Sequence, residues 1–393
     1  MTISCKYLIV GGGMTADAAA RGIRELDATG RIIMLSDEHY PPYDRPPLSK
    51  KMWTGKPLDS IFRKTEENGV EVRLETRATS GDPVDQTITD HFGNQYVYEK
   101  LLLATGGFPR RLPFHDDGVI YFRTLEDYQQ VRALAVRNAR VVVIGAGFIG
   151  SEIAAALAMN GCAVSMVFPG SGIGSHIYPP GLSGFLDAYF QEKGVTLLPR
   201  EAVAAVERSG QEFAVRTRSG KGLLCDCAIA GIGIEPDVAL AKSLGLTVDN
   251  GIVVDEYLRT SNPNIYAAGD VANFYSPALG VRRRVEHEDN ANIMGAAAGR
   301  NMTGAEKKYR HLPYFYTDLF DLGYEAVGEL ASDMEIVEDW TEPYRKGVLY
   351  YLREGRVRGV LLWNTWEQVD AARQLICTEE FQGEQSLKGR IAA

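Results

Sequence analysis

Two copies of one short pattern limit what this chain can fold into. An apolar run at 141–144 leads into G-x-G-x-x-G at 145–150, and another at 7–10 leads into G-x-G-x-x-A at 11–16. The small residues of the two patterns are Gly145, Gly147 and Gly150 in one, and Gly11, Gly13 and Ala16 in the other. Where a buried strand turns into a helix, the first small residue of each pattern allows the turn. The second lets a pyrophosphate approach the backbone, and the third lets the helix pack on the strand. The N–H groups that begin the helix then hold the phosphates.

One such pattern is weak evidence, because glycine-rich turns between a strand and a helix also occur as plain packing devices. The two copies here begin 134 residues apart (145 minus 11). They predict an α/β protein with two Rossmann-like dinucleotide-binding domains that hold two nucleotides face to face. A hydride would then need only to pass from one ring to the other.

The composition is typical of a soluble globular protein, with 45% hydrophobic and 24% charged residues. A length of 393 residues leaves room for two or three domains. The net charge of −9 argues against a nucleic-acid partner and against binding to an anionic membrane. The arginines at 282–284 are either part of a local basic patch or, more simply, a solvated loop.

The chain begins almost directly with an apolar strand, so we expect a cytoplasmic protein with no leader peptide and no membrane span. Five scattered cysteines without a C-x-x-C predict neither a metal site nor a thioredoxin-like pair. Cys225 and Cys227 alternate along a probable strand, so both thiols would lie on one face as packing groups.

Hydrophobic periodicity predicts helices and strands along the whole chain. Helices are predicted at 16–26, 121–136, 151–159, 289–301 and 366–376. Strands are predicted at 31–35, within 70–103, at 163–168, in a meander over 195–230, at 252–255 and 265–270, and in a hairpin that joins 348–352 to 357–362. The strands at 252–255 and 265–270 are expected to return to the first dinucleotide fold.

Acids at strand ends are candidates for sugar recognition. Asp37 follows the glycines by a little over twenty residues, where an adenosine ribose presents its hydroxyls, and Glu38 is the reserve. Asp270 could bind a ribityl hydroxyl or could cap a helix. The corresponding loop of the second fold, 168–172, carries neither an acid nor an arginine. This favours NADH, because no cation is at hand for a 2′-phosphate, but NADP(H) is not excluded.

The motifs taken in order resemble a known family. They are G-x-G-x-x-A, P-P-L-S-K, A-T-G-G-x-P-R, G-x-G-x-x-G-S-E, A-G-D, R-R-V-E-H and F-Y-T-D. This order resembles the flavoproteins of the glutathione-reductase fold, in particular the branch of apoptosis-inducing factor and of the ferredoxin reductases of bacterial aromatic-ring dioxygenases. The resemblance covers essentially the whole chain, and 346–376 is similar to the C-terminal domain of apoptosis-inducing factor.

The resemblance implies bound FAD in the first domain, NAD(H) in the second, and a C-terminal α+β domain. The boundaries expected are 1–115 and 248–315 for the two parts of the FAD-binding domain, 116–247 for the NAD(P)H-binding domain, and 316–393 for the C-terminal domain. Related enzymes that reduce disulfides carry two cysteines near the flavin, whereas 40–50 contains none. Electrons are therefore expected to pass directly, without a redox-active disulfide.

The resemblance also implies three catalytic residues. Lys50 would lie near the flavin N5 edge, paired with Glu152, and His287 would lie close to flavin and nicotinamide. A cation there stabilises the charge of reduced flavin, and the carboxylate can meet the carboxamide of nicotinamide. Read alone, Lys50 could also be a solvated helix-start lysine, and His287 a satisfied core histidine. Phe148 would flank the nicotinamide path, but packing also explains it.

Two sets of contact residues follow from the motifs and the resemblance together. The set expected to bind FAD is Gly11, Gly13, Ala16, Asp37, Arg45, Lys50, Thr105, Gly106, Asp270, Glu286, His287 and Tyr316, the last standing where a Trp is common. The set expected to bind NAD is Gly145, Gly147, Phe148, Ile149, Gly150, Glu152, Gly231 and Gly233.

The predicted function is an FAD-dependent NAD(P)H oxidoreductase that takes hydride from NADH and passes electrons to a ferredoxin or Rieske protein. One alternative is a redox sensor with slow turnover, in which NADH shifts conformation or dimerisation. Another is a reductase of quinones or oxygen. The expected partners are NADH and a small electron carrier, and a homodimer is possible.

Overall fold

The computed structural model describes residues 1–116, 118–135, 138–378 and 381–392. The chain forms two compact units. The first unit comprises Met1–Arg45, Pro57–Phe108 and Glu235–Pro313, and the second comprises Pro46–Lys56, Pro109–Ile234 and Tyr314–Ala393. Each unit contains one of the two glycine patterns.

The first unit is built on a sheet whose strand order is β3-β2-β1-β6-β5-β4, with β18 paired to β6. Its strands are β1 (Thr2–Val10), β2 (Ile32–Leu35), β3 (Val70–Arg73), β4 (Ala78–Asp82), β5 (Thr87–Asp90), β6 (Gln95–Leu103) and β18 (Ile265–Ala267). The strands β3, β2, β1, β6 and β18 pair in parallel, which matches the apolar runs within β1, β2, β6 and β18. The prediction that 265–270 returns to the first fold is thus confirmed for Ile265–Ala267.

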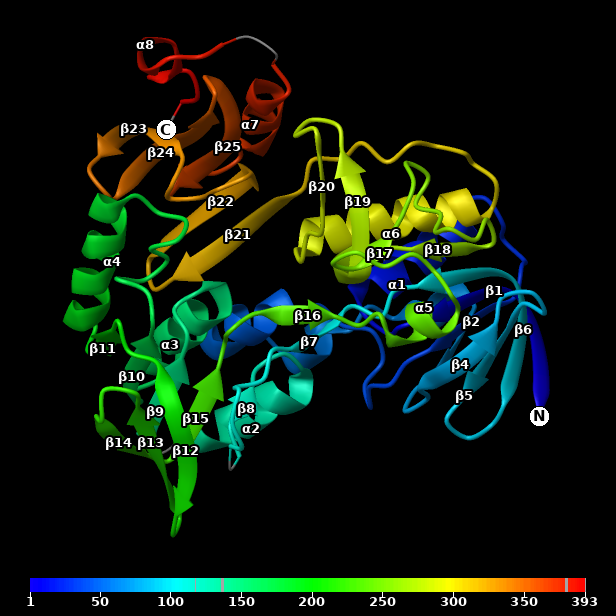
Figure 1. Cartoon of the computed structure of the whole chain (residues 1–393), viewed down its shortest axis with the longest axis horizontal. Coiled ribbons are helices and arrows are strands. Elements are labelled where there is room, and N and C mark those ends of the chain that lie inside the picture. The colour runs from blue at the N-terminus through cyan, green and yellow to red at the C-terminus, as the bar shows by residue number, and fades with distance from the viewer. Residues whose placement is uncertain (117, 136–137, 379–380, 393) are drawn as a thin grey trace. The chain divides into compact units, whose positions relative to one another are not determined.

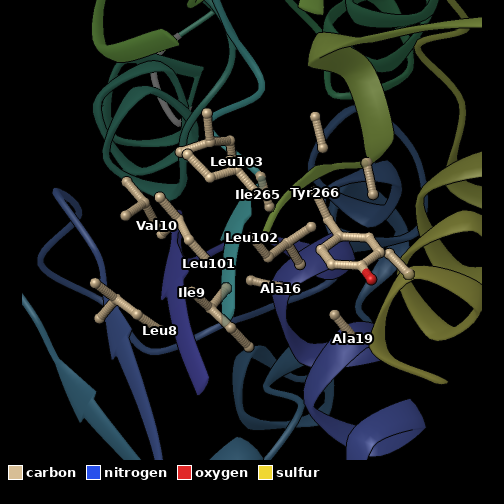
Figure 2. Close-up of a cluster of buried hydrophobic side chains, with 14 of the residues drawn as sticks. Leu8, Ile9, Val10, Ala16, Ala19, Leu101, Leu102, Leu103, Ile265 and Tyr266 are labelled. Carbon is tan, nitrogen blue, oxygen red and sulfur yellow. The ribbon is translucent and has the colours of Figure 1, made fainter. Parts of the chain in front are cut away.

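The core of the first unit lies between this sheet and two helices, α1 (Met14–Arg24) and α6 (Glu288–Met302). Figure 2 shows side chains of β1, β6 and β18 meeting Ala16 and Ala19 of α1. The two helices pack directly on each other (Figure 1). Gly299 allows this approach, because a Cβ there would lie 2.1 Å from the Ala19 carbonyl oxygen.

The strand expected at 252–255 is shorter than predicted and does not join the main sheet. It is β17 (Ile252–Val253), which pairs with β19 (Ala272–Ser276), and β19 pairs with β20 (Val281–Arg283). The strand lies in the first unit as expected, but periodicity identifies a buried strand and not its partner, so the pairing with β19 was not predicted. A short helix, α5 (Ala239–Ser243), and three 3₁₀ turns, η3 (Leu58–Ile61), η4 (Thr65–Asn68) and η5 (Gly269–Val271), complete the unit.

The second unit holds the other dinucleotide fold, a parallel sheet of order β11-β10-β9-β15-β8. Its elements are β8 (Ile120–Tyr121), α2 (Leu125–Ala135), β9 (Arg140–Ile144), α3 (Phe148–Met159), β10 (Ala163–Phe168), α4 (Pro180–Glu192), β11 (Thr196–Pro199) and β15 (Cys227–Ala230). The helix predicted at 121–136 begins later, and its last residue, 136, lies outside the described residues.

The meander predicted over 195–230 is only partly right. Its middle is an antiparallel sheet of β12 (Val203–Ser209), β13 (Glu212–Thr217) and β14 (Gly222–Cys225), whereas β11 and β15 belong to the parallel sheet. Cys225 ends β14 and Cys227 begins β15, so the two thiols do not share a strand face as predicted. Both cysteines are nevertheless buried, as expected for packing groups.

The C-terminal part is an antiparallel sheet of order β21-β22-β25-β24-β23 (orange in Figure 1). Its elements are β21 (Tyr314–Leu319), β22 (Leu322–Gly328), β23 (Glu335–Glu342), β24 (Lys346–Arg353), β25 (Arg356–Trp363), α7 (Val369–Ile376) and α8 (Glu384–Leu387). The predicted hairpin is confirmed as β24–β25. The helix predicted at 366–376 starts three residues late, because Glu367 has a left-handed φ of 64° that a helix cannot contain.

Two further features bear on function. Strands β7 (Gly107–Pro109) and β16 (Ile234–Pro236) pair with each other where the chain leaves and re-enters the first unit. The residues 46–56 contribute two 3₁₀ turns, η1 (Pro46–Ser49) and η2 (Lys51–Thr54), to the second unit.

Within the described residues, no helix has both the length and the apolarity needed to cross a bilayer.

Candidate active site

The turn between β9 and α3 has the geometry that the second glycine pattern predicts. Gly145 has a φ of +107°, and a Cβ there would lie 2.4 Å from the Gly231 carbonyl oxygen. A Cβ on Gly150 would lie 2.3 Å from the Gly145 carbonyl oxygen. Gly147, the N-cap of α3, differs, since a Cβ there meets no described atom within 4 Å. This open side, next to the N–H groups that begin α3, fits a pyrophosphate.

The first glycine turn repeats the same arrangement in the first unit. Gly11 has a φ of +123°, and its Cβ would lie 2.1 Å from the Ala104 carbonyl oxygen. Gly13 is the N-cap of α1, and its Cβ likewise meets nothing within 4 Å among the described atoms. Ala16 is fully buried against the sheet. Both units therefore contain a cradle that fits a dinucleotide.

The structure brings Lys50 and Glu152 together within the second unit. The Lys50 Nζ lies 2.7 Å from Glu152 Oε2, and the two side chains are 8% and 2% exposed. Lys50 follows η1, and Glu152 lies in the first half of α3. A charged pair this deeply buried is costly unless its hydrogen bonds are satisfied. The solvated-lysine interpretation of Lys50 does not hold in this structure.

Two hydroxyl groups complete the surroundings of Glu152. Ser49 Oγ donates to Glu152 Oε2 at 2.6 Å, and Thr317 Oγ1 donates to Glu152 Oε1. The carboxylate thus accepts from Ser49, Lys50 and Thr317 at once. These three donors hold the carboxylate from three directions.

Strand β21 presents two different faces to the site. Phe315 and Thr317, two residues apart, lie toward α3, where the Phe315 ring meets that of Phe148 edge-on at 5.2 Å between centroids. Tyr316 points the other way, and its ring centroid lies 5.0 Å from Lys50 Nζ, within cation–π distance. The strand therefore contacts both members of the Lys50–Glu152 pair.

Asp318 adds a further carboxyl to this neighbourhood. Burial raises its pKa above the ordinary range for aspartate, the charge of Glu152 adds to the rise, and Lys50 and Lys51 oppose it. No hydrogen bond to its side chain is found within the described ranges. The group is thus a half-buried acid close to the buried ion pair.

A small recess lies next to the glycine turn. Its walls are formed by Ala146, Gly147, Phe148, Ser151, Gly174, His176, Ile177, Tyr178, Thr317 and Leu319. Burial lowers the pKa of His176, which favours its neutral form. The recess adjoins the open side of Gly147, so it belongs to the same candidate nucleotide site.

Two other residues of the set expected to bind NAD lie in the second unit. Ile149 is partly exposed, and Gly233 has a φ of +93°.

Other residues of the predicted FAD set lie together in the first unit. Arg45 forms an ion pair with Glu38, which also accepts a hydrogen bond from Tyr43 Oη at 2.7 Å. Asp37, the first choice for the ribose, is half exposed and forms an ion pair with Arg77. The structure therefore brings the reserve residue Glu38, and not Asp37, to Arg45.

Arg284 links the turn at Asp270 to Glu286 of the predicted Glu286–His287 pair. Arg284 Nη1 donates to the Asp270 carbonyl oxygen at 3.0 Å and also forms an ion pair with Glu286. His287 is the N-cap of α6. Arg284 Nε is buried and finds no acceptor in the part of the chain that the structure describes, which leaves a donor for a ligand. Thr105, next to Gly106, donates to the Asp237 carbonyl oxygen at 2.7 Å.

The arginines at 282–284 do not lie in a simple solvated loop, because the first two belong to a strand. Arg282 and Arg283 lie on β20, and Arg282 Nη1 donates to the carbonyl oxygens of Val254 and Asn273. Arg284 donates to the Asp270 carbonyl oxygen and forms an ion pair with Glu286. Arg282 and Arg284 thus make hydrogen bonds within the first unit.

All five cysteines are free thiols. Burial raises the pKa of Cys225 to about 11 and that of Cys227 to about 12. Such thiols are poor nucleophiles at neutral pH. Among the described residues there is thus no disulfide, which agrees with the absence of cysteines from 40–50.

Comparison with known proteins identifies the family. Residues 5–295 match the family described as pyridine nucleotide-disulphide oxidoreductase. The chain is a member of this family. Two overlapping segments of this oxidoreductase, 298–343 and 331–378, also match the C-terminal domain described as that of mitochondrion-associated apoptosis-inducing factor.

Individual relatives span nearly the whole oxidoreductase. The ferredoxin–NAD(+) reductase component of the anthranilate 1,2-dioxygenase system of Burkholderia cepacia is 33% identical, over 97% of this chain and 96% of that protein. The putative apoptosis-inducing factor 1, mitochondrial, of Drosophila melanogaster is 30% identical over 94% of this chain, which spans 63% of that protein. The crystal structure of the covalent putidaredoxin reductase–putidaredoxin complex contains a similar chain, with a TM-score of 0.89, 30% identity, and coverage of 95% of this chain and 93% of that one.

These findings confirm the family resemblance, the fold class and the enzyme class predicted from the motifs. The chain is an FAD-dependent NAD(P)H oxidoreductase, and FAD and NAD(H) are its cofactors. The sequence reasoning did not identify Ser49, Thr317, Phe315 and Asp318 as site residues. The alternation along 314–319 could have placed Phe315 and Thr317 on one strand face, but nothing local connects that face to Glu152.

Proposed function

We propose that this chain is an NADH-dependent reductase that contains FAD and reduces a ferredoxin or a similar small iron–sulfur carrier. In this proposal the first unit holds FAD at the Gly11–Ala16 turn, and the second holds the nicotinamide dinucleotide at the Gly145–Gly150 turn. The observation that carries the proposal is the buried Lys50–Glu152 pair beside an open dinucleotide turn, without a disulfide among the described residues.

The residues have separable tasks. When bound, FAD supplies the ability to accept a hydride and to release electrons singly. Lys50 holds a positive charge that stabilises negative charge on the reduced cofactor, and burial keeps that charge unscreened by water. Glu152 orients Lys50, and the hydroxyls of Ser49 and Thr317 orient Glu152. Phe148 borders the recess in which we place the nicotinamide.

We assign the remaining predicted residues to cofactor binding. In the first unit, Arg45, Asp270 and Glu286 would contact FAD, and His287 would lie at the start of α6 beside them. The ion pairs of Arg45 with Glu38 and of Arg284 with Glu286 support this assignment, because they gather charged groups at the ends of the sheet strands.

The electron acceptor is proposed from relatives of similar length. The Burkholderia protein is a ferredoxin–NAD(+) reductase component, and the solved complex pairs a reductase with putidaredoxin. Four buried thiols fit a reducing compartment such as the cytoplasm. The net charge of −9 disfavours a nucleic-acid partner.

The visible spectrum of the purified protein, recorded after anaerobic mixing with NADH, tests the proposal. We expect the flavin absorbance to bleach rapidly and to recover on addition of oxidised ferredoxin, with turnover in the steady state. Turnover with quinone or oxygen but not with ferredoxin would overturn the assigned acceptor. A protein without a flavin spectrum would overturn the proposal as a whole.

A redox sensor is the second candidate, and the match of 298–378 to the C-terminal domain of apoptosis-inducing factor favours it. A sensor would form a long-lived reduced complex that resists air. It would also change its oligomeric state on reduction. Sizing chromatography with and without NADH separates the two functions, since a turnover enzyme has no need to change its elution volume.

A further inference from the structure

The carboxyl edge of the second dinucleotide fold contains an arginine, Arg200, that lies outside the loop 168–172. Strands β10 and β11 run parallel, with Phe168 opposite Pro199 at their ends. Directly after β11, the Arg200 N–H donates to the Gly170 carbonyl oxygen at 2.9 Å, and the Glu201 N–H donates to that of Phe168 at 3.0 Å. These two bonds join Arg200 to the loop after β10, where this fold presents the adenosine ribose.

The side chain of Arg200 is available for a ligand. The residue is exposed, with a left-handed φ of 58°. Its guanidinium group makes no hydrogen bond, ion pair or ring contact with the described residues. A guanidinium that keeps its charge and carries several donors is suited to bind a phosphate.

The acids near this edge do not oppose an anion. Glu201 is only 7% exposed, and its carboxylate accepts from Ser219 Oγ at 2.7 Å and from Lys221 Nζ at 3.0 Å. Asp187 accepts the Ile173 N–H at 2.8 Å and is thereby engaged within the fold. The loop itself has glycine at 170, where an acid would repel a 2′-phosphate.

We propose that Arg200 binds the 2′-phosphate of NADPH, so that this oxidoreductase uses NADPH as well as NADH. The inference rests on the proposed function, in which the second unit holds the nicotinamide dinucleotide. It revises the expectation from the sequence that no cation is at hand for a 2′-phosphate. The ligand class is a nucleotide that carries a phosphomonoester on the adenosine ribose.

The first test is equilibrium binding, which needs no turnover. Calorimetric titration of the FAD-loaded protein with 2′,5′-ADP and with 5′-ADP compares nucleotides that differ in the position of one phosphate. We expect 2′,5′-ADP to bind more tightly. The R200A variant should lose about tenfold or more of its affinity for 2′,5′-ADP, because charge-assisted hydrogen bonds to a phosphate disappear. Its affinity for 5′-ADP should change about twofold or less.

The second test is anaerobic flavin reduction by NADPH and by NADH in the same variants. R200A should raise the apparent Kd for NADPH and leave that for NADH nearly unchanged. R353A is the matched control, since Arg353 is an exposed arginine at the β24–β25 hairpin, outside the dinucleotide fold. It should bind both nucleotides as the wild type does, which excludes a general effect of net charge.

The reverse variant G170E tests the same subsite by adding an acid. A side chain at 170 first meets the Ser175 hydroxyl, which can rotate away, and Gly170 has no left-handed φ, so the fold should tolerate the change. We expect weaker binding of NADPH and unchanged or tighter binding of NADH. An equal effect of R200A on both nucleotides, or no reduction of the wild type by NADPH, would overturn the inference while the proposed function stands. No flavin reduction by either nucleotide would instead overturn the proposed function.

Discussion

Ser49 and Lys50, neighbours in the chain, both donate to the same oxygen, Oε2 of Glu152, at 2.6 and 2.7 Å. Thr317 donates to the other oxygen of the carboxylate. Three elements of the second unit, η1, α3 and β21, thus meet at one buried side chain. A carboxylate that is held from three directions keeps a single orientation, and it transmits that orientation to Lys50.

The first prediction concerns the charge of Glu152. E152Q keeps the size of the side chain but leaves Lys50 a buried cation without a counter-charge. We expect the free energy of unfolding to fall by about 3–5 kcal/mol and flavin reduction by NADH to slow. Urea denaturation and stopped-flow absorbance measure the two effects. E207Q, which breaks the exposed Arg216–Glu207 pair, is the control and should cost about 1 kcal/mol or less. Equal effects of E152Q and E207Q would contradict the role of burial.

The second prediction concerns Thr317. T317V removes one donor to Glu152 while it preserves the shape of the side chain, and we expect a loss of about 1–3 kcal/mol in stability. Flavin reduction should also slow, because Glu152 is held less firmly. T317S retains the hydroxyl and should restore both quantities to near the wild-type values. If T317V and T317S behave alike, the hydroxyl does not orient Glu152.

The third prediction is a pH dependence of stability from Asp318. Burial raises its pKa in the folded protein, so ionised Asp318 destabilises the fold at pH values above the ordinary aspartate pKa, about 4. D318N removes that cost. It should be more stable than the wild type near neutral pH, and the difference should vanish as the pH falls below about 4. Urea midpoints measured across this range check the sign.

The control for Asp318 is D333N, which changes an exposed aspartate of the same unit. Its stability should follow that of the wild type at every pH. Parallel curves for D318N and the wild type would show that Asp318 titrates normally in the folded protein.

The fourth prediction separates two glycines of one turn. G145A forces a left-handed residue and a 2.4 Å approach to the Gly231 carbonyl oxygen, so we expect it to lose about 2 kcal/mol or more of stability. G147A meets no described atom, so it should fold normally but bind NADH about tenfold more weakly, because its methyl group occupies the approach of the pyrophosphate. Thermal unfolding and NADH titration measure the pair. Unchanged NADH affinity in G147A would exclude this turn as the binding site.

The fifth prediction concerns the thiols. A water-soluble alkylating reagent should modify Cys377, which is exposed, and spare Cys5, Cys162, Cys225 and Cys227, which are buried. Flavin reduction by NADH should survive the treatment, because no thiol carries electrons. Peptide mass mapping and a reduction assay check both statements. Inactivation that follows the modification of a buried cysteine would show that a thiol takes part in the reaction.

Much of the fold was predictable because its determinants are local. The two glycine patterns each combine a strand, a turn and a helix start within about ten residues, and the backbone demands on Gly11 and Gly145 follow from that short connection. The Lys50–Glu152 pair was expected only from the family resemblance, because the two residues belong to motifs that stand 102 residues apart. The composition and periodicity of the chain by themselves do not join them.

The tertiary structure decided which distant segments of the chain pair with one another. Thr317 reaches Glu152 across 165 residues, and Arg200 reaches the loop after β10 because β10 and β11 end side by side. The ion pair of Glu38 with Arg45, and the separation of Cys225 from Cys227 onto two strands, are of the same kind. A periodic pattern determines which face of a strand is buried, whereas the neighbour of that face depends on strand order and register, which arise only when the chain packs.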